Sequence, residues 1–457
     1  MEQHSYEAVV VGAGIAGVAA AYALVQAGLR SIAIVESDAP LALTSDKSTE
    51  CYRNFWPGLD DAMLGLVSDS IDRLMEHAKQ SGDRFQMRQR GYLFATARAD
   101  ELAALEEQAA EVERFGGGAV RHHTGGGAAA YPVSPMSGIE PGLDGADLIT
   151  DQGLLRAHFP YLSRDAVGAL HVRKCGALSA QQLGMYLLEE ARDGGADLIR
   201  GAFVGIETAR GQLSSVTVGT PDGELSLETQ VLVLATGPHL KATAALAGTD
   251  LPVEVEKHIK ISLSDTLGVV PRDAPLLVWN DPIDLNWSAQ EREMLSETAV
   301  TRRLLETFPA GVHGRPIGVG DQLLMYWTYD CERSLVPTFP LDWDPFLPEV
   351  TLRGMAVMVP ELGVYLDPMP KPYVDGGYYT KTADNRPLIG PLRVPGSYVC
   401  GSFSGFGIMA SCAAGELLAG HVTGKALPKY ADAFRVERFD DPSYCQRIEG
   451  LAASGQL

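Results

Sequence analysis

The sequence predicts a mixed α/β fold that contains a Rossmann-like nucleotide-binding unit. Three observations predict it. Residues 6–36 read as a buried strand, a glycine turn, a helix and a second strand. Residues 253–263 alternate between apolar and polar side chains, which is typical of a strand with two different faces. A second glycine-rich turn and an apolar helix follow over residues 401–422.

Each residue of the first unit has a physical role. The apolar run 8–11 predicts a buried parallel strand. Gly12 allows the tight turn after it, Gly14 lets a pyrophosphate approach the backbone, and Gly17 lets the helix pack against the sheet. Glu36 ends the second strand, where a carboxylate accepts hydrogen bonds from a ribose diol. This unit predicts a dinucleotide site without separating FAD from NAD.

Composition limits the class of protein. The chain has 457 residues, 46% of them hydrophobic and 21% charged, so we expect a globular protein with a large core. The net charge of −21 argues against nucleic acid and anionic membranes as partners. We find no signal-peptide pattern and no membrane-spanning run. The six cysteines are scattered without metal-ligand spacing, which favours free thiols in the cytoplasm and no metal site.

The middle of the chain supplies further helices and strands. Apolar periodicity predicts helices at 64–80, 100–115 and 180–194 and strands at 91–95, 199–206, 213–218 and 231–235. The last strand ends in Thr236 and Gly237. A glycine turn at a strand end suits a close approach of the backbone to a cofactor.

Two later strands carry candidate site residues. In 253–263 the polar face includes His258 and Lys260, and we expect such a face to be solvated unless it lines a site. Residues 323–329 predict a strand with aromatic side chains on both faces. Its Tyr326 and Trp327 are candidates for the wall of a substrate pocket or for the core.

The final glycine-rich turn follows a strand at 398–400 and opens a helix that runs to about residue 422. One pyrophosphate needs only one helix N-terminus. A second one suits another partial negative charge, such as the charge that builds at the pyrimidine end of a reduced isoalloxazine.

Taken together, the motifs resemble the D-amino-acid oxidase superfamily of FAD-dependent amine oxidoreductases, near its glycine oxidase and sarcosine oxidase branch. The matching segments occur in the family's order along the chain: 11–17 with Glu36, 234–237, 379–387 and 405–408. The resemblance implies a Rossmann-like FAD-binding domain interleaved with an antiparallel-sheet substrate domain. The FAD-binding domain is expected at 1–84, 165–252 and 372–457, and the substrate domain at 85–164 and 253–371.

The resemblance also implies the residues that contact FAD. Adenosine and pyrophosphate are expected at the first glycine turn, Val204 beside the adenine, and the start of the last helix at the pyrimidine end of the flavin. The full implied set is Gly12, Gly14, Ile15, Ala16, Gly17, Glu36, Ser37, Ser48, Thr49, Val204, Thr236, Gly237, Gly405, Phe406, Gly407, Ile408 and Met409.

Three positions depart from the pattern of the sarcosine oxidase relatives. Gly377 stands where relatives with covalent flavin carry cysteine, so we expect non-covalent FAD. Glu50 and Met409 stand where those relatives carry an arginine and a carboxylate-binding lysine. Arg53 matches their remaining carboxylate-binding arginine. Half of a carboxylate clamp therefore remains, which favours a larger or differently anchored substrate than sarcosine.

The resulting expectation is oxidation of the C–N bond of a secondary or N-substituted amine or a D-amino acid. Hydride passes from the α-carbon to flavin N5, and water hydrolyses the imine. Arg53 holds an acidic group of the substrate, Phe406 lies in the substrate pocket, and Lys260 favours reduction of O2, the expected acceptor. Another electron acceptor and a homo-oligomer stay open.

Two alternatives belong to other classes. A 2-hydroxy-acid dehydrogenase needs a base over the flavin, and His258 is the candidate for that role. A non-catalytic flavoprotein subunit of a larger dehydrogenase binds FAD without turning over a substrate of its own.

Overall fold

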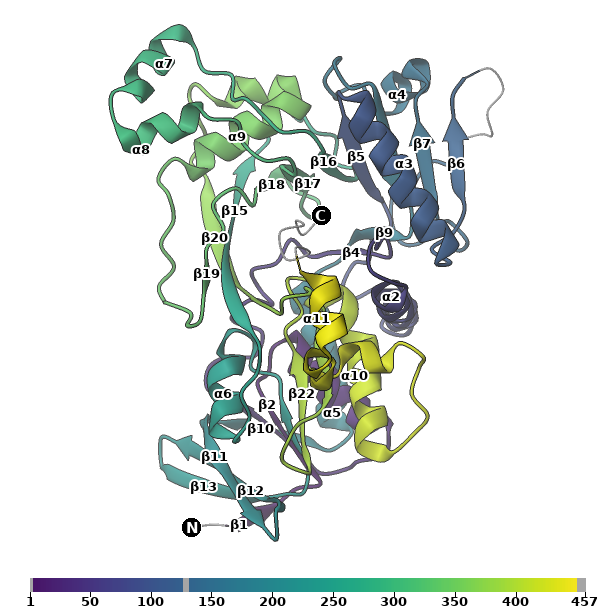
Figure 1. Ribbon diagram of the computed structural model, residues 1–457. Coiled ribbons are helices and arrows are strands. Elements are labelled where there is room, and N and C mark those ends of the chain that lie inside the picture. The colour runs from purple at the N-terminus through teal and green to yellow at the C-terminus, as the bar shows by residue number, and fades with distance from the viewer. Residues whose placement is uncertain (1–2, 126–130, 450–457) are drawn as a thin grey trace.

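The computed structural model describes residues 3–125 and 131–449. It has two main bodies, each built on its own sheet (Figure 1). In that view the six-stranded sheet and its helices lie below, and the ten-stranded sheet lies above. The mixed α/β class predicted from the sequence is confirmed.

The six-stranded sheet is the Rossmann-like body. Its order is β10 (Ala196–Arg200), β3 (Ile32–Glu36), β2 (Ala8–Val11), β14 (Leu232–Leu234), β22 (Ser397–Gly401) and β21 (Leu388–Pro391). All pairs are parallel except β21 with β22. The two strands at its centre, β2 and β14, are apolar and buried at every position, as expected for a parallel sheet covered on both faces.

Three helices pack side by side on this body: α1 (Ile15–Gln26), α5 (Ala180–Asp193) and α10 (Gly407–Thr423). Helices α1 and α10 approach closely because Gly415 has no side chain, and a Cβ there would lie 2.6 Å from the Ala19 oxygen. A Cβ on Gly407 would lie 3.2 Å from Ile15. The N-termini of α1 and α10, the two glycine-rich helix starts, therefore lie next to each other.

A smaller four-stranded sheet changes one prediction. It comprises β1 (Gln3–Ser5), β13 (Gly223–Glu228), β12 (Gln212–Thr220) and β11 (Ala202–Ala209). The single strand predicted at 199–206 is wrong, because β10 ends at Arg200 in one sheet and β11 begins at Ala202 in another. Gly201 lies at the junction, where a Cβ would meet Val218 at 2.5 Å.

The ten-stranded sheet is mostly antiparallel. It contains β19 (Arg333–Ser334), β15 (Glu254–Ser264), β18 (Gln322–Tyr326), β17 (His313–Pro316), β16 (Leu276–Trp279), β5 (Tyr92–Thr96), β8 (Gly168–Val172), β7 (Ala146–Ile149) and β6 (Val120–His123), with β20 (Tyr373–Lys381) also paired to β15. Strands β8 and β20 belong to this sheet although they fall inside the predicted FAD-domain segments 165–252 and 372–457.

The two faces of this sheet differ. One face forms an apolar core with α9 (Leu347–Met358), and it includes Ile259, Met325 and Trp327. The opposite face carries Lys260, Tyr326 and His313, which pair across three neighbouring strands in one row. Side chains of directly opposed residues point to the same face of a sheet, so this row lies together.

The remaining elements complete the two bodies. They are α2 (Ala62–Gln80), α3 (Ala99–Arg114), α4 (Gln152–His158), α6 (Leu240–Leu246), α7 (Ala289–Ser296), α8 (Ala299–Arg302), α11 (Pro442–Ile448) and the strand pair β4 (Cys51–Arg53) and β9 (Cys175–Ala177). Among the helices described, none combines the length and apolarity needed to cross a bilayer.

Candidate active site

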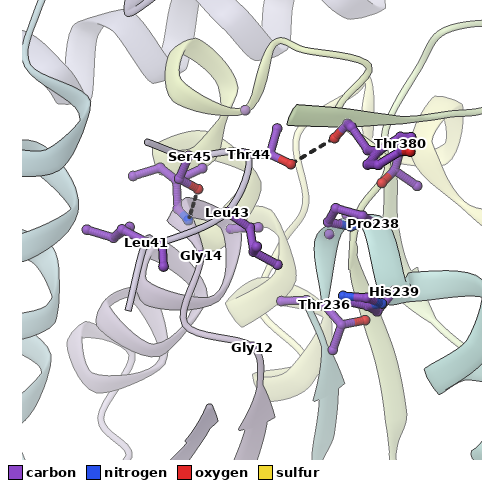
Figure 2. Close-up of a pocket in the computed structure, with 18 of the residues that line it drawn as sticks. Gly12, Gly14, Leu41, Leu43, Thr44, Ser45, Thr236, Pro238, His239 and Thr380 are labelled. Atoms are coloured by element: carbon purple, nitrogen blue, oxygen red, sulfur yellow. Dashed lines mark hydrogen bonds between the residues drawn. The ribbon is translucent and has the colours of Figure 1, made fainter. Parts of the chain in front are cut away.

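A cavity of about 740 Å³ lies where helices α1 and α10 begin. Figure 2 shows Gly12 and Gly14 on one side of it and Thr236, Pro238 and His239 on the other. Most of the predicted cofactor residues line it: Gly12, Gly14, Ile15, Ala16, Glu36, Ser37, Ser48, Thr236, Gly237, Gly405, Gly407 and Ile408. Its volume falls within the usual range for ligand sites.

The local geometry of this cavity fits a pyrophosphate. Helix α1 begins after Gly14, which has no side chain to cap the helix. The N–H of Ile15 donates to Ser45 Oγ at 2.9 Å, and that of Ala13 donates to Glu36 Oε2 at 2.8 Å (Figure 2 shows Ser45). The first residues of the helix, Ile15 and Ala16, line the cavity, so the positive dipole end of α1 lies at its wall, where it suits a pyrophosphate.

Two predicted cofactor residues line neither this cavity nor the smaller one that adjoins it. Gly17 packs against the strand turn, where a Cβ would lie 1.8 Å from the Gly12 oxygen. Its role is therefore the close approach of helix and strand that the motif predicts. Val204 is 42% exposed, and the cavity wall beside it is formed by Gly201, Ala202 and Phe203.

A second, smaller cavity of about 50 Å³ adjoins the first. The two share Ser48, Tyr379, Gly405 and Ile408. The predicted residues Arg53, Tyr326, Thr49, Phe406 and Met409 line the second cavity, together with Glu50, Cys51, Tyr92, Leu276, His313 and Thr328. A large cavity and a small compartment that contains Arg53 therefore meet at common walls.

Arg53 supplies positive charge to the second cavity. The side chain is buried, and its guanidinium carbon lies 4.9 Å from the Trp56 ring centroid, 5.9 Å from that of Tyr92 and 6.0 Å from that of Phe406. Burial lowers the pKa of Arg53 below its ordinary value. Arginine stays charged in proteins, so the aromatic rings surround a cation that suits a carboxylate ligand.

The structure separates the two aromatic candidates: Tyr326 ends β18 and Trp327 follows it, so the strand predicted at 323–329 is wrong beyond Tyr326. Tyr326 lines the second cavity, whereas Trp327 is buried in the core on the opposite face, where its indole N–H donates to the Pro309 oxygen at 3.0 Å. Successive strand residues point to opposite faces, so neighbours cannot both line one pocket. Trp327 therefore packs in the core, which is the second of the two roles that the sequence allows for it.

Lys260 links the two bodies. Its Nζ donates to the main-chain oxygen of Ser48 at 2.8 Å, and Ser48 lines both cavities. The side chain is half-buried, and burial lowers the pKa of its ammonium group from the ordinary value. The prediction that this face of the strand is solvated is therefore wrong at Lys260, because the other body covers its side chain.

His258 is enclosed in a hydrogen-bonded network and does not line either cavity. Its Nε2 lies 2.8 Å from Glu256 Oε1, which also accepts from Lys381 Nζ at 2.7 Å, and Glu256 Oε2 accepts from Arg333 Nε at 3.0 Å. The Nδ1 atom contacts the Tyr326 hydroxyl. Glu256 and His258 are both buried, so here too the solvated-face prediction is wrong.

The charges of this network fix its proton positions. Against the opposing effect of burial, the hydrogen bonds from His258 and Lys381 hold the pKa of Glu256 well below its usual range. Burial lowers the pKa of His258 to about 4. A neutral imidazole that faces a carboxylate through Nε2 carries its proton there, so Nδ1 accepts the hydrogen bond from Tyr326.

The same cluster contains ligand types that metals prefer. Glu256, His258 and Cys331 offer three donor atoms within 4.8 Å of one another. Lys381 and Arg333 already place two positive charges on the Glu256 carboxylate. A divalent cation would be repelled by these charges, so we interpret the cluster as a structural polar network.

Two residues near the second cavity were not predicted from the sequence. Arg315 donates to the Thr49 oxygen at 2.7 and 2.9 Å and pairs with Glu50 at 3.3 Å. His313 lines the cavity beside Arg53. Both lie on β17 two residues apart, and the alternation of these polar residues with Val312 and Gly314 was the available signal.

The comparisons with known proteins agree with this architecture. The family model DAO, described as FAD dependent oxidoreductase, matches residues 7–420. Comparison of the sequence with curated proteins finds no match.

Solved structures share the fold over nearly the whole chain. The L-proline dehydrogenase from P. horikoshii is 20% identical, with 96% of this chain and 99% of that chain covered and a TM-score of 0.72. Glycine oxidase from Bacillus cereus is 16% identical, with coverages of 93% and 97% and a TM-score of 0.68. The FAD-bound L-α-glycerophosphate oxidase from Mycoplasma pneumoniae is 15% identical, with coverages of 94% and 97% and a TM-score of 0.67.

The family match spans the βαβ unit, both cavities and most of α10, and the first cavity fits the cofactor that the family uses. The chain therefore belongs to the DAO family of FAD-dependent oxidoreductases.

Proposed function

We propose that the protein oxidises the C–N bond of an amino acid or another amine that carries a carboxylate. The observation that carries the proposal is the buried Arg53 in a small compartment that shares walls with the predicted FAD site. Two of the similar structures are named as a proline dehydrogenase and a glycine oxidase, which supports an amino acid as the substrate class.

The chain's own residues bind and orient the substrate. Arg53 pairs with the carboxylate, and the rings of Trp56, Tyr92 and Phe406 keep water away from that pair. Met409 makes the wall beside it apolar, and among the described residues that line this cavity Arg53 is the one cation that can anchor the acid. Bound FAD supplies a hydride acceptor at N5, and water then hydrolyses the resulting imine. Positioning is the main requirement of this reaction.

We further propose that FAD is held without a covalent bond and that O2 accepts its electrons. Position 377 is glycine, and among the described residues that line the first cavity there is no cysteine. Lys260 places a cation beside Ser48, where it favours the transfer of electrons to O2. All six cysteines are free thiols, which supports a cytoplasmic location.

An anaerobic titration of the purified holoenzyme tests the proposal. The panel comprises N-methyl amino acids, D- and L-amino acids, cyclic imino acids, polyamines and 2-hydroxy acids. We expect an amino or imino acid to bleach the flavin absorbance and peroxide to form when air returns. Bleaching without reoxidation by air would replace the oxidase with a dehydrogenase. A holoenzyme that no member of the panel bleaches would contradict the catalytic proposal and favour the non-catalytic subunit.

A second candidate, oxidation of a 2-hydroxy acid, is favoured by one observation. That reaction needs a base for the hydroxyl proton, and His313 lines the second cavity beside Arg53. His258, the residue predicted from the sequence for this role, is enclosed in its hydrogen-bonded network and does not line the cavity. Bleaching by 2-hydroxy acids alone would establish this candidate in place of amine oxidation.

A further inference from the structure

We propose that His313 accepts a hydrogen bond from the group bound to the substrate's α-carbon, so that the second cavity selects carboxylic acids with an N–H or O–H donor at that position. The inference deepens the proposed function and rests on it, because it takes Arg53 as the carboxylate site.

The first support is the position of His313 in the sheet. On β17 it lies directly opposite Tyr326 of β18, and the two ring centroids are 4.9 Å apart in an edge-to-face arrangement. Both side chains line the cavity that contains Arg53. A ligand held by its carboxylate at Arg53 therefore has the His313 ring among its neighbours.

The second support is the tautomer of the imidazole. Nδ1 lies 2.9 Å from the main-chain oxygen of Gly311. A carbonyl oxygen only accepts hydrogen bonds, so Nδ1 carries the proton. Burial, with a further contribution from Arg53, lowers the pKa of His313 to about 4. The ring is then neutral at pH 7, and its Nε2 presents a lone pair.

The third support is the state of that lone pair. Nε2 of His313 bonds to none of the residues that the structure describes. Nδ1 is held on the opposite edge of the ring, so Nε2 is the polar atom that the ring can offer a ligand. A donor beside the carboxylate satisfies it, and a ligand atom with its own lone pair is repelled. A neutral hydrogen bond of this kind changes affinity by about 3- to 10-fold.

Two planar acids of nearly equal shape test the inference. Pyrrole-2-carboxylate carries an N–H beside the carboxylate-bearing carbon, and furan-2-carboxylate carries an oxygen lone pair there. Neither has a tetrahedral α-carbon with hydrogen, so neither can be oxidised by hydride transfer. Binding to the holoenzyme is followed through the perturbation of the flavin spectrum. We expect pyrrole-2-carboxylate to bind about 3- to 10-fold more tightly. Equal affinities would overturn the inference without any variant.

Variants then assign the preference to His313. His313→Leu should bind the two acids equally, whereas His313→Gln, whose amide oxygen can accept, should retain part of the preference. His122→Leu, an exposed histidine on β6 of the same sheet, is the matched control and should keep the wild-type ratio. A His313→Leu protein with the full preference would refute the role of His313. Because neither probe is oxidised, a failed substrate panel would contradict the proposed function and leave this binding result standing.

Discussion

Lys260 Nζ donates a hydrogen bond to the main-chain oxygen of Ser48 at 2.8 Å, which ties the ten-stranded sheet to the loop that lines both cavities. Its neighbour Lys257 points the other way and pairs with the exposed Asp342 at 2.8 Å. One strand therefore directs one lysine to the loop that lines both cavities and the other to an exposed carboxylate. This contrast provides a variant and its matched control.

We expect Lys260→Met to slow reoxidation of the reduced enzyme by O2 at least about tenfold, because a cation that stabilises the negative charge of reduced oxygen is lost. Lys257→Met should leave that rate within about twofold. Stopped-flow mixing of anaerobically reduced enzyme with oxygenated buffer measures both. Equal reoxidation rates in the two variants would remove Lys260 from the oxidative step.

Arg53→Gln should weaken the binding of carboxylate substrates at least about tenfold, since a buried charge-assisted pair is lost. The effect should appear in the dissociation constant from anaerobic titration more than in the limiting rate of flavin reduction. An amine without a carboxylate provides the internal control, because its affinity should not fall. Loss of affinity for both ligands would mean that Arg53 shapes the cavity instead of binding the acid.

Gly17→Ala should reduce FAD content and lower the free energy of unfolding by about 1–3 kcal/mol, because its Cβ would lie 1.8 Å from the Gly12 oxygen. Gly320→Ala is the control, since a Cβ there meets nothing within 4 Å. FAD released by denaturation is quantified against protein. A Gly17→Ala protein with full FAD content and wild-type stability would contradict the close packing of α1 against the Gly12 turn.

Substitutions of Tyr326 and Trp327 should affect different properties, the first the kinetics of flavin reduction and the second the stability of the fold. Trp327→Leu is expected to lower the free energy of unfolding by about 2–4 kcal/mol, through the cavity that it leaves in the core, and to leave substrate affinity unchanged. Tyr326→Phe should alter flavin reduction with a smaller loss of stability. Urea unfolding and anaerobic reduction are measured on both proteins. The reverse pattern would show that the assigned faces are exchanged.

Stability should fall as the pH is lowered from 7 to 5. Burial lowers the pKa of both His258 and His313 from 6.5 to about 4. The unfolded chain therefore binds more protons than the native protein between pH 6.5 and pH 4, so unfolding becomes easier as pH falls through this window. Each histidine lowers the free energy of unfolding by about 2 kcal/mol between pH 7 and pH 5.

Urea unfolding at pH 7 and pH 5 checks this dependence. His313→Gln should show a smaller difference between the two pH values than the wild type, because one of the titrating groups is absent. If the free energy of unfolding were the same at both pH values, the two imidazoles would not be neutral and buried in the native state.

Local chemistry explains why much of the cofactor site is readable from the sequence. The strand turn at Gly12, the helix that starts after Gly14 and the carboxylate of Glu36 lie within one βαβ unit, so their geometry follows from short-range rules. The second helix start at Gly407 obeys the same rules. The structure adds that the two helix starts lie next to each other at one cavity.

The second cavity is different because distant strands build it. Arg53 comes from β4, Tyr326 from β18 and His313 from β17, and their meeting depends on sheet order and register. Likewise, the polar face of β15 is buried by the opposing body instead of facing solvent.

By itself, the sequence determined the α/β class and the nucleotide-binding unit, since both follow from periodicity or from motifs with local geometry, and its family resemblance pointed to Arg53 as a candidate carboxylate-binding arginine. Only the tertiary structure decided that Tyr326 and not Trp327 faces the site, that His258 is enclosed, and that His313 lies beside Arg53. Strand alternation sets which residues share a face, but long-range pairing sets which face meets the cofactor cavity.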